Sequence, residues 1–229
     1  KNFGESGWVS RQSLNRFLNV IGDGHQPSRI IFYSGVNDVL SGCRQLNKFP
    51  PAHARENLID TRLEKSKNIF NYFLITIRMP FEKLAIKIKT SQDSKKSLTG
   101  YDCHTNLLKA KKIASHLVNN WYTTYSIAKI NGYEFHAILQ PHIFTINAQY
   151  DYQKEIINSN KPRSLQFKTV YPLILSEVKN KCLKDKSFCS SFIDGTKWID
   201  GNLHTFWDIC HLNGKGNKII AQQIIKNLN

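Results

Sequence analysis

The sequence predicts an α/β fold with a mostly parallel sheet and helices on both of its faces, a three-layer α/β/α sandwich. Short, continuously apolar runs, at residues 29–33 and 134–139, alternate along the chain with longer segments of helical periodicity. Runs of this kind suit strands that are buried on both faces, and their alternation with helices is typical of α/β domains. The chain has 229 residues, of which 41% are hydrophobic, so we expect a single domain over residues 1–229.

The first helix is expected over residues 10–20 and the first strand over residues 29–33. The apolar residues of the helix recur at the spacing of one helix face: Leu14, Phe17, Leu18 and Ile21. The strand reads Arg-Ile-Ile-Phe-Tyr and is followed by Ser-Gly-Val-Asn-Asp. Asn37 therefore follows the carboxyl end of a strand, which is where open parallel sheets bind their ligands.

The rest of the chain continues the alternation. A helix is expected over residues 52–79, because Pro80 stops it, and the polar residues 90–100 are expected to form a loop. Beyond them the pattern predicts helix, strand, helix, strand and helix in turn, at residues 105–130, 134–139, 164–181, 191–194 and 216–228. Helices thus separate the predicted strands, as the crossovers between parallel strands require.

The chain is strongly basic, with 32 lysines and arginines against 17 aspartates and glutamates and a net charge of +15. Such a charge attracts nucleic acid, anionic lipid or acidic polysaccharide, although a solvated, lysine-rich surface is the simpler account. No RNA-binding motif, zinc-finger spacing or basic heptad region is present, so nothing in the sequence specifies a nucleic acid. No apolar run is long enough for a transmembrane helix, and the location in the cell stays open.

The five cysteines are Cys43, Cys103, Cys182, Cys189 and Cys210. Their odd number leaves at least one unpaired and argues against a scaffold built from disulfides. Cys182 and Cys189 can pair across a short loop if the protein is exported. No C-x-x-C motif and no cluster of histidines and cysteines has the spacing of metal ligands, so we expect no metal site and no cofactor.

The segment Asp-Ile-Cys-His at residues 208–211 places a carboxylate three residues before an imidazole, just ahead of the closing helix. In such a pair the imidazole acts as a general base, and the carboxylate fixes its tautomer and stabilises its charged form. A histidine that caps the last helix is the structural alternative. We expect Asp208 and His211 to face one site, and Cys210 to point away from it and serve packing.

Together with two upstream segments, this motif resembles the SGNH (GDSL-type) hydrolase family. Residues 2–12 match the family's N-x-x-x-x-G-x-x-S-x-Q-like stretch, in which Gly7 is the glycine, and residues 35–38 match its G-x-N-D segment. The third match is D-x-x-H at residues 208–211. The resemblance spans nearly the whole chain and implies a flavodoxin-like sandwich.

The resemblance also implies the parts of an acyl-transfer site. His211 is the general base and Asp208 its orienting partner. The backbone N–H of Gly7 and the side-chain amide of Asn37 donate hydrogen bonds to the oxyanion of the tetrahedral intermediate. His142, which follows the strand at residues 134–139, is expected to lie near the bound substrate.

One part of the family's pattern is not present. Its first block, a G-D-S segment that carries the nucleophilic serine at the end of the first strand, should precede residue 2, where only Lys1 stands. The nearest look-alike, Gly-Asp-Gly at residues 22–24, has no serine. We therefore expect the chain to be N-terminally incomplete and to lack its first strand and nucleophile. Ser6 and Ser10 are interpreted as turn and helix-cap hydroxyls.

The motifs predict a serine ester hydrolase or O-acyltransferase whose nucleophile lies outside these 229 residues. Residues 40–105 exceed what a compact family member needs and are expected to form a helical cap; with the basic surface, this favours an acylated sugar or lipid as substrate. The expected partner is thus a small-molecule or glycan ester. The alternative is a catalytically inactive α/β domain that binds acidic polysaccharide or nucleic acid through its basic surface. The sequence upstream of Lys1 discriminates between them, because a G-D-S segment there favours the enzyme.

Overall fold

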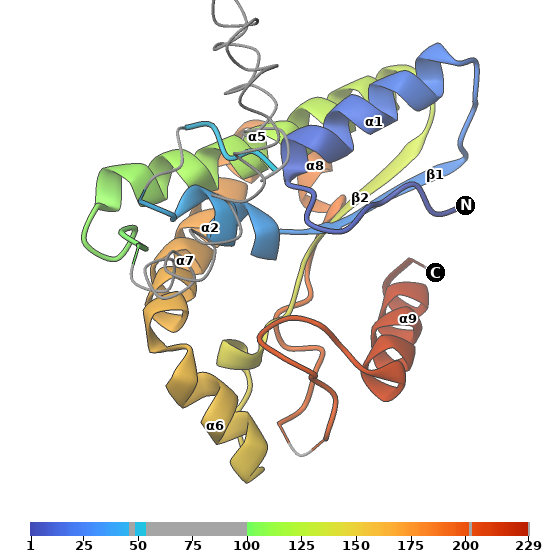
Figure 1. Ribbon diagram of the computed structural model, residues 1–229. Helices are drawn as coiled ribbons and strands as arrows, with labels where there is room; N and C mark the ends of the chain where they lie inside the picture. The colour runs from blue at the N-terminus through green and yellow to red at the C-terminus, as the bar shows by residue number, and fades with distance from the viewer. Residues whose placement is uncertain (46–48, 54–99, 202, 229) are drawn as a thin grey trace, which may run out of the picture.

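The computed structural model describes residues 1–45, 49–53, 100–201 and 203–228 (Figure 1). Its helices and strands follow one another in this order: α1 Ser10–Gly22, β1 Arg29–Ser34, α2 Val36–Gly42, α5 Leu107–Ile130, β2 Glu134–Leu139, the 3-10 helix η1 Ile143–Thr145, α6 Asp151–Ser159, α7 Lys161–Lys184, α8 Lys186–Cys189, β3 Phe192–Asp194 and α9 Gly214–Leu228. The mixture of helices with a small parallel sheet confirms the predicted α/β class.

The three strands form one parallel sheet in the order β1-β2-β3. In the register of the sheet, Ile30 pairs with Phe135, and Ile138 pairs with Ile193. The predicted strands at residues 29–33, 134–139 and 191–194 are therefore present, and the predicted parallel pairing of the first two is confirmed. Because the strands are parallel, their carboxyl ends meet at one edge of the sheet.

The two longer strands differ in burial. In β2 every residue from Phe135 to Leu139 is buried, whereas in β1 only Phe32 and Ser34 are, and Ile31 is 41% exposed. The expectation that the first strand is buried on both faces is wrong for Ile31. The physical reason is position: among the described strands, β1 lies at the edge of the sheet and has fewer neighbours than the central β2.

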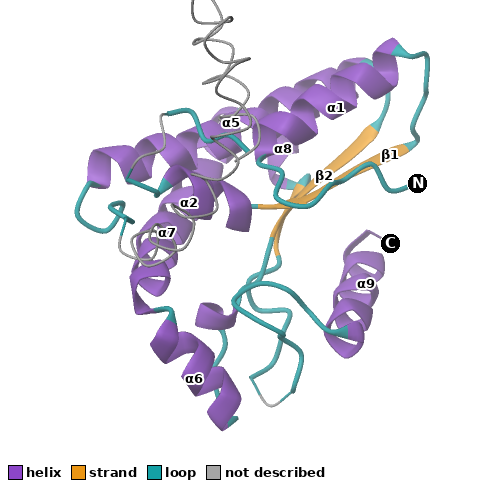
Figure 2. Ribbon diagram, viewed as in Figure 1, coloured by secondary structure: helices purple, strands orange, loops and turns teal. Residues whose placement is uncertain are grey.

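Helices lie on either side of the strands. The long helices α5 and α7 pack against each other, α5 packs against β2, and α1 lies along α5. Figure 2 shows α9 on the side of β1 and β2 opposite to α1 and α5. The core between α5 and the sheet is built around Trp121, which is fully buried and donates from its indole N–H to the Ser34 hydroxyl over 3.1 Å. The three-layer sandwich, the single domain and the missing strand stay predictions.

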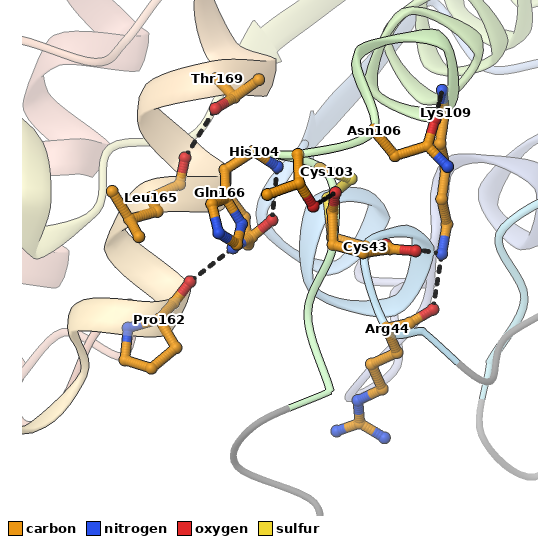
Figure 3. The surroundings of a disulfide bond; sticks show 12 residues. Cys43, Arg44, Cys103, His104, Asn106, Lys109, Pro162, Leu165, Gln166 and Thr169 are labelled. Atoms are coloured by element: carbon orange, nitrogen blue, oxygen red, sulfur yellow. Dashed lines mark hydrogen bonds and ion pairs between the residues drawn. A yellow bond between two sulfur atoms is a disulfide. The ribbon is translucent and has the colours of Figure 1, made fainter.

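The boundaries of the segment predicted to form a cap, residues 40–105, are held together. Cys43 and Cys103 form a disulfide, and Arg44 and Tyr101 form an antiparallel bridge next to it. Lys109 of α5 donates both to the Arg44 carbonyl and to the carboxylate of Asp102 (Figure 3). The two ends of this segment, at residues 43–45 and 100–103, therefore lie side by side. The predicted helix at 52–79 and loop at 90–100 lie almost wholly outside the described residues.

A second disulfide joins Cys182 to Cys189, the pair that the sequence suggested, and Cys210 is free. The sequence did not indicate the pairing of Cys43 with Cys103, because the two cysteines are 60 residues apart. Four of the five cysteines thus form disulfides, and the predicted unpaired cysteine is Cys210. No helix in the described part of the chain is long and apolar enough to cross a membrane.

Candidate active site

Asn37 and Gly7 lie together at the carboxyl end of β1. Asn37 stands in the first turn of α2, directly after the strand, and its side-chain amide donates to the Trp8 carbonyl over 3.0 Å. An amide has two N–H donors, so this bond leaves the second one for another acceptor. The contact fixes Asn37 beside the turn that contains Gly7.

Gly7 has a backbone that favours glycine. Its φ is +78°, in the left-handed region, and a Cβ at this position would lie 2.8 Å from Nε2 of His53. A larger residue would therefore be strained and would also displace the His53 ring. The absence of a side chain at Gly7 lets the His53 ring pack against this turn.

A buried hydrogen-bond network lies next to Asn37 and Gly7 and supports them. The Asp38 carboxylate is fully buried and accepts from the Ser10 N–H at 3.1 Å and from the Ser10 hydroxyl at 2.6 Å. Asn120 of α5 donates to the same hydroxyl at 2.8 Å. Burial raises the pKa of Asp38 to about 6, although the hydrogen bonds from Ser10 lower it. The network joins α1, α2 and α5, so it holds Asn37 and Gly7 in register with the sheet.

Asp208 and His211 form a second, local arrangement. Oδ2 of Asp208 lies 2.7 Å from Nδ1 of His211, and Oδ1 accepts from the backbone N–H groups of Cys210 and His211 at 2.9 and 2.8 Å. Partial burial raises the pKa of Asp208, but these hydrogen bonds lower it more, so the pKa of this carboxyl lies below its usual value. Both side chains are accessible, with 73% of His211 and 51% of Asp208 exposed.

The loop that carries the pair lies at the carboxyl end of β2. The Ile143 N–H, just beyond that strand, donates to the Ile209 carbonyl over 2.9 Å. Asn37 follows the neighbouring parallel strand, so both arrangements belong to the same edge of the sheet. Between them lies the buried Tyr171. Its hydroxyl donates to the Gln140 carbonyl, and burial, with smaller effects of nearby groups that include Cys210 and Asp38, raises its pKa well above the usual value. No hydrogen bond among the described residues joins His211 directly to Asn37 or Gly7.

The sequence led us to expect that Cys210 points away from Asp208 and His211, but in the structure it lies on the same side as they do. Its sulfur lies 3.9 Å from Nδ1 of His211, because the turn from Asp208 to His211 brings all three side chains to one side. Burial and the nearby Asp208 carboxylate raise the pKa of the Cys210 thiol to about 12, so it is protonated at neutral pH. The three donor atoms lie within 4.8 Å of one another and could hold a metal ion. The absence of a metal site stays a prediction.

His142, which the sequence places near the substrate, is buried. It is 2% exposed and packs against the rings of Phe144, Phe167 and Tyr171. Neither ring nitrogen has a hydrogen-bond partner in the described residues. Burial, with a smaller effect of the Lys197 charge, lowers the pKa of His142 to about 3, so the ring is neutral. The His142 ring packs against Tyr171, and its role in substrate binding stays a prediction.

The sequence did not single out two residues that the structure places in or beside this site. Asn120 lies 110 residues from Ser10, in the middle of a helix where nothing local marks it. His53 follows Pro51 and Ala52 and reaches Gly7 through the fold alone. A hollow of about 550 Å³ lies between the N-terminal segment and α1, but neither Asn37 nor His211 lines it.

The comparisons with known proteins give one match. A family model described as GDSL-like Lipase/Acylhydrolase matches residues 1–224. No curated protein and no solved structure matches the chain. The matched range contains all of the residues above, from Gly7 and Asn37 to Asp208 and His211.

Proposed function

The chain belongs to the GDSL-like lipase/acylhydrolase family, and we propose that it is a serine ester hydrolase or O-acyltransferase in which His211 is the general base. The observation that carries the proposal is the 2.7 Å contact between Asp208 and Nδ1 of His211. With its Nδ1 proton held by the carboxylate, the imidazole presents Nε2 as its basic nitrogen.

The proposed reaction uses this basicity twice. Nε2 of His211 takes the proton of a serine hydroxyl while the serine oxygen attacks the ester carbonyl carbon, and Asp208 stabilises the imidazolium that forms. The imidazolium then gives its proton to the departing alcohol, which leaves an acyl-serine. Water, activated in the same way, releases the acid; a second alcohol in its place would give acyl transfer.

The oxyanion of the tetrahedral intermediate needs donors that are already in position. We assign this role to the Gly7 N–H and to the second N–H of the Asn37 amide. The bond from Asn37 to Trp8 and the buried network around Asp38 support the assignment, because they hold both donors without the help of a substrate. Donors that need no reorganisation stabilise the developing charge most strongly.

The nucleophile is proposed to be the serine of a G-D-S segment outside these 229 residues. Two observations support this. Nε2 of His211 has no hydroxyl partner among the described residues, and β1 pairs only with β2 in the described sheet, so its other edge is open. A parallel strand on that edge would end beside Gly35 and Asn37, where a serine could reach the donors.

We propose a small-molecule or glycan ester as substrate, with His142 acting indirectly by supporting Tyr171. The net charge of +15 favours a second candidate, an inactive domain that binds acidic polysaccharide or nucleic acid. The test is a longer chain that carries the upstream G-D-S segment, assayed with nitrophenyl acetate beside its Ser→Ala variant and the 229-residue chain. We expect activity only in the unmodified longer chain. Equal activity in all three would place the nucleophile within these 229 residues. No activity in any, together with binding to heparin, would favour the second candidate.

A further inference from the structure

Trp207 is the immediate neighbour of His211 across a tight hairpin. Phe206 and Leu212 form an antiparallel bridge, and the Trp207 N–H donates to the His211 carbonyl over 2.8 Å. Residues that stand directly opposite in an antiparallel pair project to the same side, with Cβ atoms about 5 Å apart. The pair 206/212 faces inward, since Phe206 is fully buried, so Trp207 and His211 both face outward.

The exposure of Trp207 is unusual for a residue of its size. Its side chain is 69% exposed, beside an imidazole whose side chain is 73% exposed. Large apolar surface left in water is costly, and contiguous exposed apolar patches mark binding sites. Since the other outward residue of this hairpin is the proposed catalytic base, the surface that Trp207 offers is one that a substrate at His211 would contact.

Further aromatic rings extend this surface. The ring of His204 lies 6.5 Å from that of Trp207, Tyr152 lies 4.3 Å from His204, and Tyr150 lies 6.0 Å from Tyr152, all between ring centroids. His204 is exposed, and Tyr150 is 43% exposed. We call Trp207, His204, Tyr152 and Tyr150 the aromatic row. It leads from the proposed catalytic base towards the start of α6.

Hydrogen bonds to the backbone of the segments that carry the aromatic row hold it in place. The fully buried Gln153 accepts from the Tyr150 N–H at 3.2 Å and donates to the Leu203 carbonyl at 3.2 Å, which joins the two loops that carry the rings. Asn213 donates to the His204 carbonyl at 2.8 Å. A surface fixed in this way loses little conformational entropy when a ligand binds.

We propose that the aromatic row binds the sugar of an O-acylated neutral glycan and places its ester at His211. A sugar ring has a face of C–H groups that stacks on an aromatic ring, and hydroxyls on its rim that bond to polar ring edges such as those of Trp207, His204 and Tyr150. An acyl chain would instead need an enclosed apolar groove, and this row is open to solvent. The ring contacts within the row involve no lysine or arginine, so the row offers a sugar stacking faces and polar edges. The inference rests on the proposed function, because the aromatic row can place an ester for reaction only if His211 is the catalytic base.

The direct test is binding of an O-acetylated xylo-oligosaccharide to the Ser→Ala variant of the longer chain that carries the G-D-S segment, measured by calorimetry. This needs no nucleophile and so does not depend on turnover. We expect Trp207→Ala to weaken binding by about 10-fold, and Trp207→Phe, which keeps a ring, to retain most of it. Leu183→Ala, at a residue of α7 that is 77% exposed, is the matched control and should change nothing. Unchanged binding in Trp207→Ala, or no binding of the oligosaccharide by the parent chain, would overturn the proposal.

Two further experiments distinguish a failure of the sugar-site proposal from a failure of the proposed esterase function. In the longer chain, Trp207→Ala should raise KM for the acetylated oligosaccharide by about 10-fold, whereas Leu183→Ala should leave this KM and the hydrolysis of nitrophenyl acetate unchanged. An equal KM in parent and variant would remove the sugar site while the esterase stands. Glycan binding that depends on Trp207, without any esterase activity, would support the sugar site and remove the proposed esterase function. Trp207-dependent binding to phosphatidylcholine vesicles, with no binding of the oligosaccharide, would overturn the sugar assignment in favour of a lipid.

Discussion

The two halves of the candidate site are built in opposite ways. The half with Gly7 and Asn37 is assembled from α1, α2 and α5, through a buried network whose members Ser10 and Asn120 are 110 residues apart. The half with Asp208 and His211 is assembled within four residues and is largely exposed. The first half therefore depends on the folded core, whereas the second depends mainly on the conformation of one turn.

This difference predicts that mutations in the two halves separate activity from stability. A change in the exposed half removes chemistry and leaves the fold intact, because few contacts are lost. A change in the buried half also affects the free energy of unfolding, because it leaves buried polar groups without partners.

The largest effect is expected for His211→Ala in the longer chain that carries the G-D-S segment. Loss of the general base should lower kcat for nitrophenyl acetate by about 10⁴-fold or more. The free energy of unfolding should change by less than about 0.5 kcal/mol, since the ring is exposed. Activity assays and urea unfolding of the same samples measure both. A large loss of stability would contradict the comparison between the two halves.

Asp38 gives the next largest effect, on the pH dependence of stability. Its pKa is about 6 in the folded protein against an ordinary value of 3.8, so folding favours the protonated form. The contribution of Asp38 to the free energy of unfolding, about 3 kcal/mol, is fully present below pH 3.8 and is lost as pH rises through about 6. Asp38→Asn should remove it. The difference in unfolding free energy between parent and variant should change between about pH 4 and pH 6 and stay constant above pH 7.

The measurement for Asp38 is urea unfolding of both proteins across this pH range. Taking the difference isolates Asp38, because every other titrating group, His142 included, is common to the two. Asp208→Asn is the matched carboxylate in the exposed half. Its pKa lies below the ordinary value, so its contribution has the opposite sign: it is present above the ordinary pKa and lost as pH falls. A difference between parent and Asp38→Asn that does not vary with pH would show that Asp38 is not penalised by burial.

Asn37→Ala should affect both properties at once. Loss of an oxyanion donor is expected to lower kcat by ~100-fold, and loss of its bond to the Trp8 carbonyl should destabilise the protein by about 1 kcal/mol. Asn119→Ala, at an exposed position of α5, is the matched control and should leave both unchanged. If KM rises and kcat stays constant, Asn37 binds the ground state and is not an oxyanion donor.

The smallest effect is expected for Cys210→Ala. Although its sulfur lies 3.9 Å from His211, the raised pKa of the thiol keeps it protonated and unreactive at neutral pH. Turnover of nitrophenyl acetate should stay within about two-fold of the parent, as expected when no charge-carrying group is removed. Inactivation of the parent by iodoacetamide at pH 7, abolished in the variant, would show instead that this thiol is reactive and that its neighbours activate it.

The sequence by itself determined the features that are local in the chain. The alternating patterns located three strands and most of the long helices, and the parallel pairing of β1 with β2 followed from the helix between them. The D-x-x-H spacing was enough to bring Asp208 to His211, because three residues form one turn. The G-x-N-D segment placed Asn37 at the end of a strand for the same reason.

Only the tertiary structure decided what depends on distant segments. It exposed Ile31, paired Cys43 with Cys103, buried His142 among aromatic rings and brought Asn120 to Ser10. Burial and long-range hydrogen bonds depend on which elements pack together, and a local pattern does not encode that choice. The outward position of Trp207 beside His211 belongs to the same class, because it follows from Phe206 and Leu212 meeting across a hairpin and from Phe206 entering the core.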